Sequence, residues 1–181
     1  MGAYAPAPIV DAAVRARVAT TIVTPSIDGL RAEGTPFIGV LFVGLMIEPD
    51  GTPWVIEYNC RFGDPEVQAL AFGAQAPLLP VLHDAATGQL RPGALACSPS
   101  ATVVLAAAGY PGVPRAGDVI TGLADADAHA DVKVFHAGTR RRDDGAFVTH
   151  GGRVLPTPTA DDEHAHVGVP LGPSGGSVAR A

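Results

Sequence analysis

The sequence has little of several residue classes that mark particular kinds of protein. Its 181 residues include only two cysteines, Cys60 and Cys97, which lie in unlike contexts and without metal-ligand spacing. They indicate neither a disulfide framework nor a zinc site, and they fit a reducing, cytoplasmic setting. Charged residues make up 17% of the chain and aromatic residues 6%. A small secreted domain held together by disulfides is therefore a poor fit.

Basic clusters and long apolar runs are also scarce. The net charge is −6, and the arginine triplet at 140–142 is followed at once by Asp143 and Asp144. We interpret the triplet as a solvated hairpin turn, with phosphate or nucleic-acid binding as the alternative. The N-terminus lacks a signal-peptide pattern, and the longest apolar run, 37–47, is too short to span a membrane. We expect no nucleic-acid target and no membrane.

Apolar residues make up 47% of the chain, which allows a real core in one ordinary domain or two small ones. Residues 1–8 contain two prolines and a glycine and are predicted to be loop. Apolar residues then recur every four positions, which predicts an amphipathic helix over 9–22. The sequence Thr-Pro-Ser at 24–26 is predicted to interrupt it, before a short second helix over 26–32.

The next stretch predicts a hairpin followed by helices. Residues 37–47 are apolar throughout and predict a strand buried on both faces. The Asp-Gly turn within 48–53 returns the chain as a strand over 54–59, antiparallel to the first. Helices are predicted over 65–72 and 77–87.

The return strand carries the first candidate site. Alternate side chains of a strand share a face, so Val55, Glu57 and Asn59 are predicted to project one way. Trp54, Ile56 and Tyr58 are predicted to project the other way. A carboxylate and an amide oxygen side by side suit Mg²⁺, which fills its octahedron with water and phosphate oxygens.

The residues that follow predict a turn into a helix. Gly63 permits a sharp turn, Asp64 is a good N-cap, and Pro65 is pre-set for the first helical position. This arrangement would bring Glu57, Asn59, Arg61 and exposed backbone N–H groups close together. A metal-bound phosphate could sit there.

The character of the chain changes between residues 93 and 100. From there it reads as short strands separated by glycine turns, predicted over 101–108, 118–120, 132–136, 146–149 and 153–155. After Leu155 the apolar periodicity stops, and residues 156–181 are predicted to be disordered. His164 and His166 beside three acidic residues leave metal binding as the alternative for this tail.

Several motifs, in order along the chain, resemble the phosphoribosylamine–glycine ligases, which are ATP-grasp enzymes of purine biosynthesis. The motifs lie at residues 1–8, 39–47, 55–66, 107–112, 134–139 and 151–155. The resemblance covers roughly residues 1–155. It implies an α+β fold: the C-terminal half of an ATP-grasp domain, with an antiparallel sheet and helices, and then a small mostly-β C-terminal domain.

The resemblance also implies a division of the chain. Residues 1–95 would be the metal-bearing part of the ATP-grasp domain, 96–155 the C-terminal domain, and 156–181 a disordered or frame-altered tail. Full-length family members begin with a further α/β domain and the second ATP-clasping lobe. We therefore expect a fragment that is inactive alone. A non-catalytic remnant or binding module, or another ATP-grasp ligase, are the alternative readings.

The implied reaction joins glycine to 5-phosphoribosylamine at the expense of ATP, through a glycyl phosphate, and releases ADP and phosphate. By the family's pattern, Glu57 and Asn59 hold Mg²⁺ or Mn²⁺, and Arg61 stabilises the transferring phosphate or a substrate anion. For Asp64 and Glu66 two roles are open: Asp64 as a structural helix cap, and contact of Asp64 and Glu66 with the glycine amine or phosphoribosylamine. The partners would be small molecules only, and family members of full length are expected to be monomers.

Overall fold

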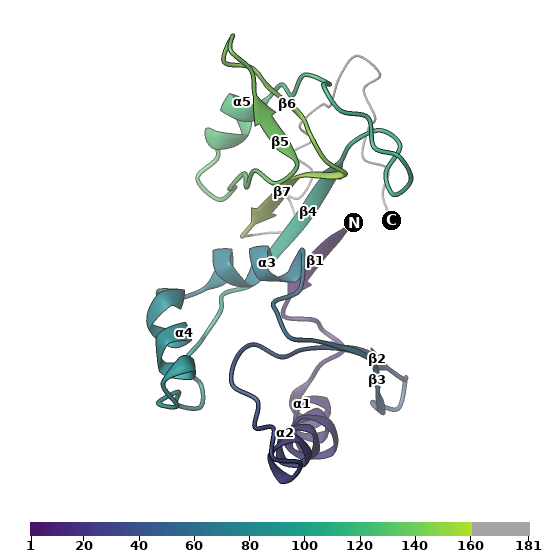
Figure 1. Ribbon diagram of the computed structural model, residues 1–181, viewed down its shortest axis with the longest axis vertical. Helices are drawn as coiled ribbons and strands as arrows, with labels where there is room; N and C mark the ends of the chain where they lie inside the picture. Colours follow the sequence, from purple (N-terminus) through teal and green to yellow (C-terminus); the bar gives the residue numbers. More distant parts are fainter. Residues whose placement is uncertain (161–181) are drawn as a thin grey trace. The chain divides into compact units, whose positions relative to one another are not determined.

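The computed structural model describes residues 1–160, which form two compact units (Figure 1). Within the described residues, the sheet unit comprises 1–5, 64–73 and 97–160. The hairpin unit comprises residues 6–63 and 74–96. The boundary between residues 95 and 96, predicted for two domains, stays a prediction.

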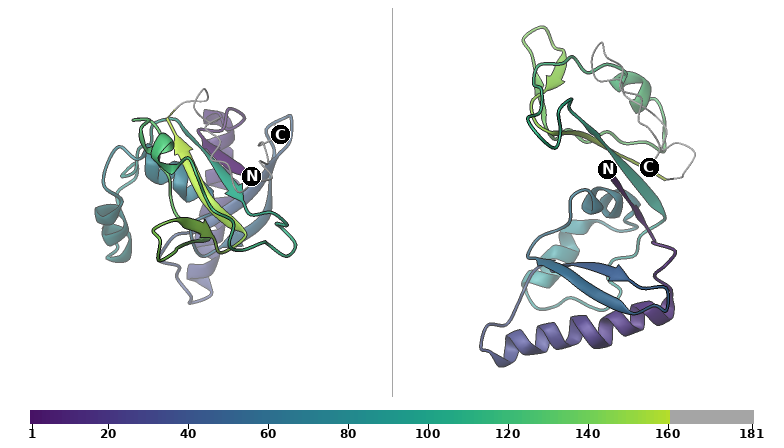
Figure 2. Two further views of the ribbon diagram at one scale, coloured as in Figure 1. Left: turned by 90° about the horizontal axis from the view of Figure 1, so that it is seen from above. Right: turned by 90° about the vertical axis from the view of Figure 1, so that its right-hand side faces the viewer.

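A continuous helical rod opens the hairpin unit, as the right-hand view of Figure 2 shows. It consists of α1 (Ala12–Val18), the π-helical turn η1 (Ala19–Val23) and α2 (Thr24–Ala32). The predicted interruption at 24–26 is therefore wrong. Pro25 lies in the first turn of α2, directly after the π turn, where its missing N–H is tolerated. The Ser26 hydroxyl donates to the carbonyl of Ile22 at 2.7 Å and further supports this junction.

Gly29 is the weak point of this rod. It lies in α2, and a Cβ added there would meet no atom within 4 Å. Replacing Gly29 with alanine should therefore raise the free energy of unfolding by about 0.5–1 kcal/mol, because alanine loses less backbone entropy in a helix. Urea unfolding followed by circular dichroism measures the change. A lower stability would contradict the open surroundings of this glycine.

The predicted hairpin is confirmed. Strands β2 (Phe42–Ile47) and β3 (Pro53–Asn59) pair antiparallel, and Gly51 takes a positive φ of 80° in the turn. Hydrogen bonds from the side chain and backbone of Thr52 lower the pKa of the Asp50 carboxyl, which shapes the same turn. The strand is shorter than predicted and is not buried on both faces. Only one face packs on the helical rod, so Met46 stays 59% exposed.

The sheet unit is built on a three-stranded sheet in the order β1–β4–β7. Strand β1 (Gly2–Ala5) pairs antiparallel with β4 (Ser100–Ala106), so the prediction of a loop over residues 1–8 is wrong for its first part. The pairing explains the glycine at position 2, because a Cβ there would collide with the carbonyl oxygen of Thr102. Strand β1 therefore depends on pairing with β4, and its own residues do not predict it.

Strand β7 (Arg153–Thr159) corrects the predicted end of ordered chain at Leu155. It pairs with β4 on one side, and on the other the carbonyls of Pro156 and Pro158 accept from the N–H groups of Phe135 and Lys133. In an antiparallel pair the N–H and C=O of one residue face the same neighbour. The missing N–H groups of both prolines therefore face residues 132–137 and not β4. In that pairing the N–H groups of Phe135 and Lys133 donate to β7, but the prolines donate nothing in return, so 132–137 does not form a full strand. Residues 161–181, with His164 and His166, lie outside the described part.

The remaining elements are short. Helices α3 (Glu66–Gly73) and α4 (Leu78–Ala86) confirm the two predicted helices, and α5 (Leu123–Asp127) was not predicted. Strands β5 (Thr139–Arg141) and β6 (Phe147–Thr149) form a hairpin whose turn holds the predicted arginine–aspartate cluster. Residues 118–120 form only an isolated bridge to β6. The core of the sheet unit consists of Leu105, Ala107, Ile120, Ala126, Val134, Val154 and Leu155.

Two further observations concern the described residues 1–160. Both cysteines are free thiols. None of the helices there combines the length and the apolar character that a membrane span needs.

Candidate functional site

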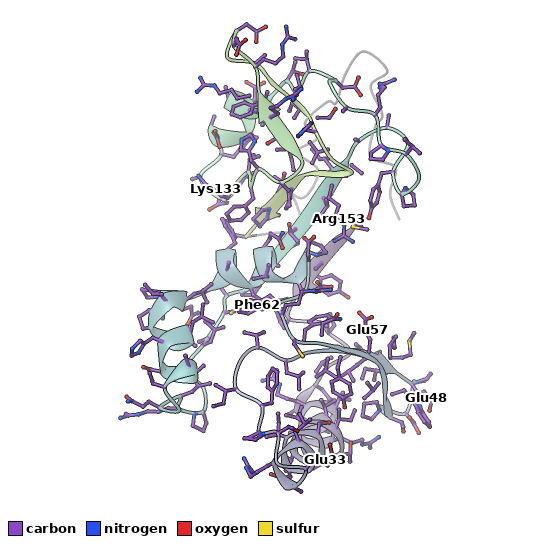
Figure 3. All side chains as sticks on the ribbon, in the orientation of Figure 1. Glu33, Glu48, Glu57, Phe62, Lys133 and Arg153 are labelled. Atoms are coloured by element: carbon purple, nitrogen blue, oxygen red, sulfur yellow. The ribbon has the colours of Figure 1, made fainter. Side chains whose placement is uncertain are left out.

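Three polar side chains at the end of β3 form a connected row, and Figure 3 labels its first member, Glu57. The Asn59 amide donates from Nδ2 to Oε1 of Glu57 at 2.9 Å. Arg61 donates from Nη2 to Oδ1 of Asn59 at 3.2 Å and from Nη1 to the carbonyl of Phe62 at 2.9 Å. The structure therefore brings together the three residues that we predicted to meet in the hairpin unit.

The face that carries this row differs from the predicted one. Gly44 pairs with Glu57 but Leu45 pairs with Val55, so Ile56 is an extra residue, a β-bulge. Because β2 alternates regularly, Glu57 shares its face with Trp54 instead of Val55. Trp54 is 58% exposed on this face. The opposite face turns toward the helical rod, where the Tyr58 hydroxyl lies 2.7 Å from the hydroxyl of Ser26.

The Glu57–Asn59 pair fits a divalent cation. A half-turn of the Asn59 amide exchanges its oxygen and nitrogen, which would place two hard oxygens about 2.9 Å apart. The same half-turn would give up the bond that Asn59 accepts from Arg61, which frees the guanidinium. With Mg²⁺–oxygen bonds of 2.0–2.1 Å, neighbouring ligands of an octahedron lie about 2.9 Å apart. Within residues 1–160 no group of three histidine, cysteine or acidic side chains gathers. Mg²⁺ is usually bound through one or two carboxylates and keeps several waters.

Phe62 anchors the segment that follows Arg61. It lines an apolar hollow of about 530 Å³ in the hairpin unit, together with residues of α4 and of the loop at 90–95. Phe62 therefore holds the chain after Arg61 against apolar neighbours, while Arg61 itself remains exposed.

Asp64 belongs to the sheet unit and makes a second polar cluster. Arg153, at the start of β7, donates from Nη1 to Oδ2 of Asp64 at 2.8 Å and to its backbone carbonyl at 2.6 Å. Gln68 donates from Nε2 to Oδ1 of Asp64 at 2.9 Å. The carboxylate is thus taken by two side chains and not by helix N–H groups. The predicted cap is wrong in detail, since α3 begins at Glu66 and Pro65 precedes it.

The Arg153 guanidinium is itself held from a second direction. It donates from Nε to the hydroxyl of Tyr110 at 3.1 Å, and this bond, followed by the Asp64 carboxylate, raises the pKa of Arg153. The sequence reasoning missed both residues. Arg153 stands 89 residues from Asp64, and only its place in the motif at 151–155 could have drawn attention to it.

Glu66 is the last of the predicted site residues, and His136 is a histidine of the sheet unit with partners of its own. Glu66 lies half-buried in the first turn of α3, and its carboxylate makes no hydrogen bond or ion pair with any described residue. His136 is exposed, with Nδ1 3.0 Å from the hydroxyl of Thr139 and its ring 4.4 Å from that of Phe147. Both contacts lie within the β5–β6 hairpin region of the sheet unit, so they give His136 a structural role there.

The sequence matches two models of one synthetase. The family model of the phosphoribosylglycinamide synthetase ATP-grasp (A) domain matches residues 1–67. The model of the C domain of the same synthetase matches residues 100–166. The chain belongs to the phosphoribosylglycinamide synthetase family. Its membership confirms the predicted fold class, an ATP-grasp part followed by a small C domain.

Individual relatives agree with this assignment. The chain is 46% identical over 157 residues to a phosphoribosylamine–glycine ligase of Vibrio vulnificus, covering 86% of this chain and 36% of that protein. A crystal structure of a phosphoribosylamine–glycine ligase from Thermotoga maritima matches with a TM-score of 0.75 at 30% identity, over 92% of this chain and 40% of that one.

An N5-carboxyaminoimidazole ribonucleotide synthetase from Thermotoga maritima shares the fold, with a TM-score of 0.60 at 18% identity over 91% of this chain and 42% of that one. The present chain spans a little more than a third of the length of the Vibrio vulnificus ligase that it matches.

Proposed function

We propose that this chain supplies the metal-binding part of the ATP-grasp site, and the C domain, of a phosphoribosylamine–glycine ligase. In the proposed reaction, ATP phosphorylates the glycine carboxylate, and the amine of 5-phosphoribosylamine attacks the resulting acyl phosphate. The products are glycinamide ribonucleotide, ADP and phosphate. The observation that carries the proposal is the Glu57–Asn59 pair, presented by β3 within a chain that matches both domain models of this family.

Each residue of the row at the end of β3 has a task in this proposal. Glu57 and Asn59 hold Mg²⁺ or Mn²⁺ through their side-chain oxygens, and the bound ion supplies neutralisation of phosphate charge. Arg61 is exposed beside Asn59, and its planar guanidinium suits two oxygens of a phosphate or of a substrate carboxylate. Asp64 and Glu66 follow Arg61 in the sequence, and this acidic stretch takes part in binding the amine groups of glycine or phosphoribosylamine.

The proposal names small-molecule partners only: ATP, glycine and 5-phosphoribosylamine. A cytoplasmic location and a monomeric ligase belong to the same proposal. The exposed apolar side chains of the hairpin, Met46 and Trp54, agree with a site that is completed by further chain when the ligase is whole.

A chimera tests this function. We expect that this chain, replacing the matching 157 residues of the Vibrio vulnificus ligase, will restore ADP formation that requires both glycine and phosphoribosylamine. The chain alone is expected to show no turnover, because it spans little more than a third of that relative. A coupled assay of ADP release measures both.

The same assay separates the alternatives. ADP release that does not require glycine and phosphoribosylamine would point to another ATP-grasp ligase. A chimera that folds but releases no ADP would favour a non-catalytic binding module of ATP-grasp origin. In both cases the proposed ligase function would be wrong.

A further inference from the structure

We propose that the two acidic residues that follow the candidate site in the sequence, Asp64 and Glu66, have different tasks. Arg153 and Gln68 hold Asp64 as a positioning residue, and Glu66 is left to bind the amine of a substrate. This inference rests on the proposed ligase function, which assigns an amine substrate to this stretch of chain without dividing the work between its two carboxylates.

The Asp64 carboxylate is committed on both of its oxygens. Oδ1 accepts from Gln68 at 2.9 Å and Oδ2 accepts from Arg153 at 2.8 Å. The same Nη1 atom of Arg153 also reaches the backbone carbonyl of Asp64 at 2.6 Å. Side chain and backbone are therefore gripped together, which fixes the position of this residue. A substrate amine would have to displace these bonds before it could use the carboxylate.

Arg153 is preorganised for this grip. Its Nε donates to the Tyr110 hydroxyl at 3.1 Å. The preceding residue, Gly152, lies so close to the Tyr110 ring that an added Cβ would stand 2.6 Å from a ring carbon. Tyr110 is thus held by packing on one side and holds Arg153 on the other. A guanidinium fixed in this way loses little further freedom when it binds Asp64.

Glu66 offers what Asp64 lacks. It stands two residues further on, half-buried, and its carboxylate has no partner among residues 1–160. A half-buried carboxylate without a donor keeps its acceptor capacity for an incoming N–H group, and a charge-assisted bond to an amine is a strong one. The first turn of α3 favours a negative charge at this position. The ammonium of glycine and the amine of phosphoribosylamine share this chemistry.

Kinetics of the chimera test the division. We expect Glu66→Gln to raise the KM of one amine substrate at least tenfold while the KM for ATP stays within twofold. The substrate whose KM rises is the one that Glu66 binds.

Asp64→Asn and Arg153→Met should each lower kcat about tenfold. The kcat of the double variant should be no lower than that of the less active single variant, because both substitutions remove the same contact. Arg153→Lys, which keeps the charge, should recover part of the loss.

Two results would overturn the inference. One is a Glu66→Gln enzyme whose KM values for both amine substrates stay within twofold of the unsubstituted chimera. The other is an Asp64→Asn/Arg153→Met enzyme whose losses multiply, since independent residues would then be at work.

Hydrogen exchange in the full chain tests the grip without any ligase activity. The backbone amide of Gln68, which donates to the carbonyl of Pro65, and the amides that follow it in α3 should exchange at least tenfold faster in Arg153→Met than in the unsubstituted chain. Arg140→Met, at an exposed arginine of β5 with no partner among residues 1–160, is the matched control and should leave them unchanged. Unchanged exchange in Arg153→Met would overturn the positioning role. An inactive unsubstituted chimera would overturn the proposed function instead, so the two failures are distinguishable.

Discussion

Replacing Glu57 with glutamine in the chimera should reduce turnover about a thousandfold or more. Glutamine keeps the size of the side chain but removes the charge of the only carboxylate in the row at the end of β3. A bound cation contributes several kcal/mol of charge stabilisation to phosphoryl transfer, and each 1.36 kcal/mol corresponds to a factor of ten in rate. Steady-state ADP release measures the loss.

The fold should survive this change. Glu57 is exposed, and its recorded bond within the hairpin unit, from the Asn59 amide, can also be made to a glutamine oxygen. The free energy of unfolding should therefore change by less than about 0.5 kcal/mol. Glu48→Gln is the control, because Glu48 is also an exposed carboxylate and lies at the turn end of the same hairpin (Figure 3). Near-normal turnover by Glu57→Gln would refute the metal-binding role.

The sequence was informative about this pair because the two residues lie on the same side of the β-bulge. Alternation over two positions, from Glu57 to Asn59, holds wherever the strand is regular, and the 2.9 Å bond between them confirms it. Extending the same alternation to Val55 failed, since the extra residue at Ile56 shifts the face of everything before it. No residue near Ile56 signals a bulge.

Elements held by distant partners were the ones that sequence reasoning missed. The residues of β1 are glycine, alanine and tyrosine before two prolines, and by themselves they predict a loop. The strand forms because β4, about a hundred residues later, pairs with it. The prolines after Leu155 were interpreted as the end of order. Pro156 and Pro158 fit a strand because their missing N–H groups both face residues 132–137, away from β4. Propensity describes the segment alone and cannot include such partners.

The same limit applies to the polar cluster around Asp64. Its residues are typical of a helix cap, and local rules assign it to one. Arg153 competes successfully for the carboxylate because a charged donor makes a stronger bond than a backbone N–H. Only a fold that brings the start of β7 to the start of α3 reveals this contact.

Leu155→Ala should give the largest loss of stability, about 3 kcal/mol. Leu155 is 0% exposed and packs in the core of the sheet unit, on a strand that is covered on both faces. Truncating a fully buried leucine removes its transfer free energy and leaves a cavity, for a total of about 2–5 kcal/mol. We place the value in the middle of that range because α3 and the loop at 132–137 can relax only in part around β7.

Urea unfolding followed by circular dichroism measures this loss, and Val113→Ala is its control in the same unit. Val113 is 91% exposed, so its truncation should change the free energy of unfolding by less than about 0.5 kcal/mol. The comparison also tests the ordered length of β7. If the chain really frayed after Leu155, as the sequence alone indicated, that side chain would lie at an open end and could repack freely. A loss below about 1 kcal/mol would then be expected, and it would contradict a strand that continues buried to Thr159.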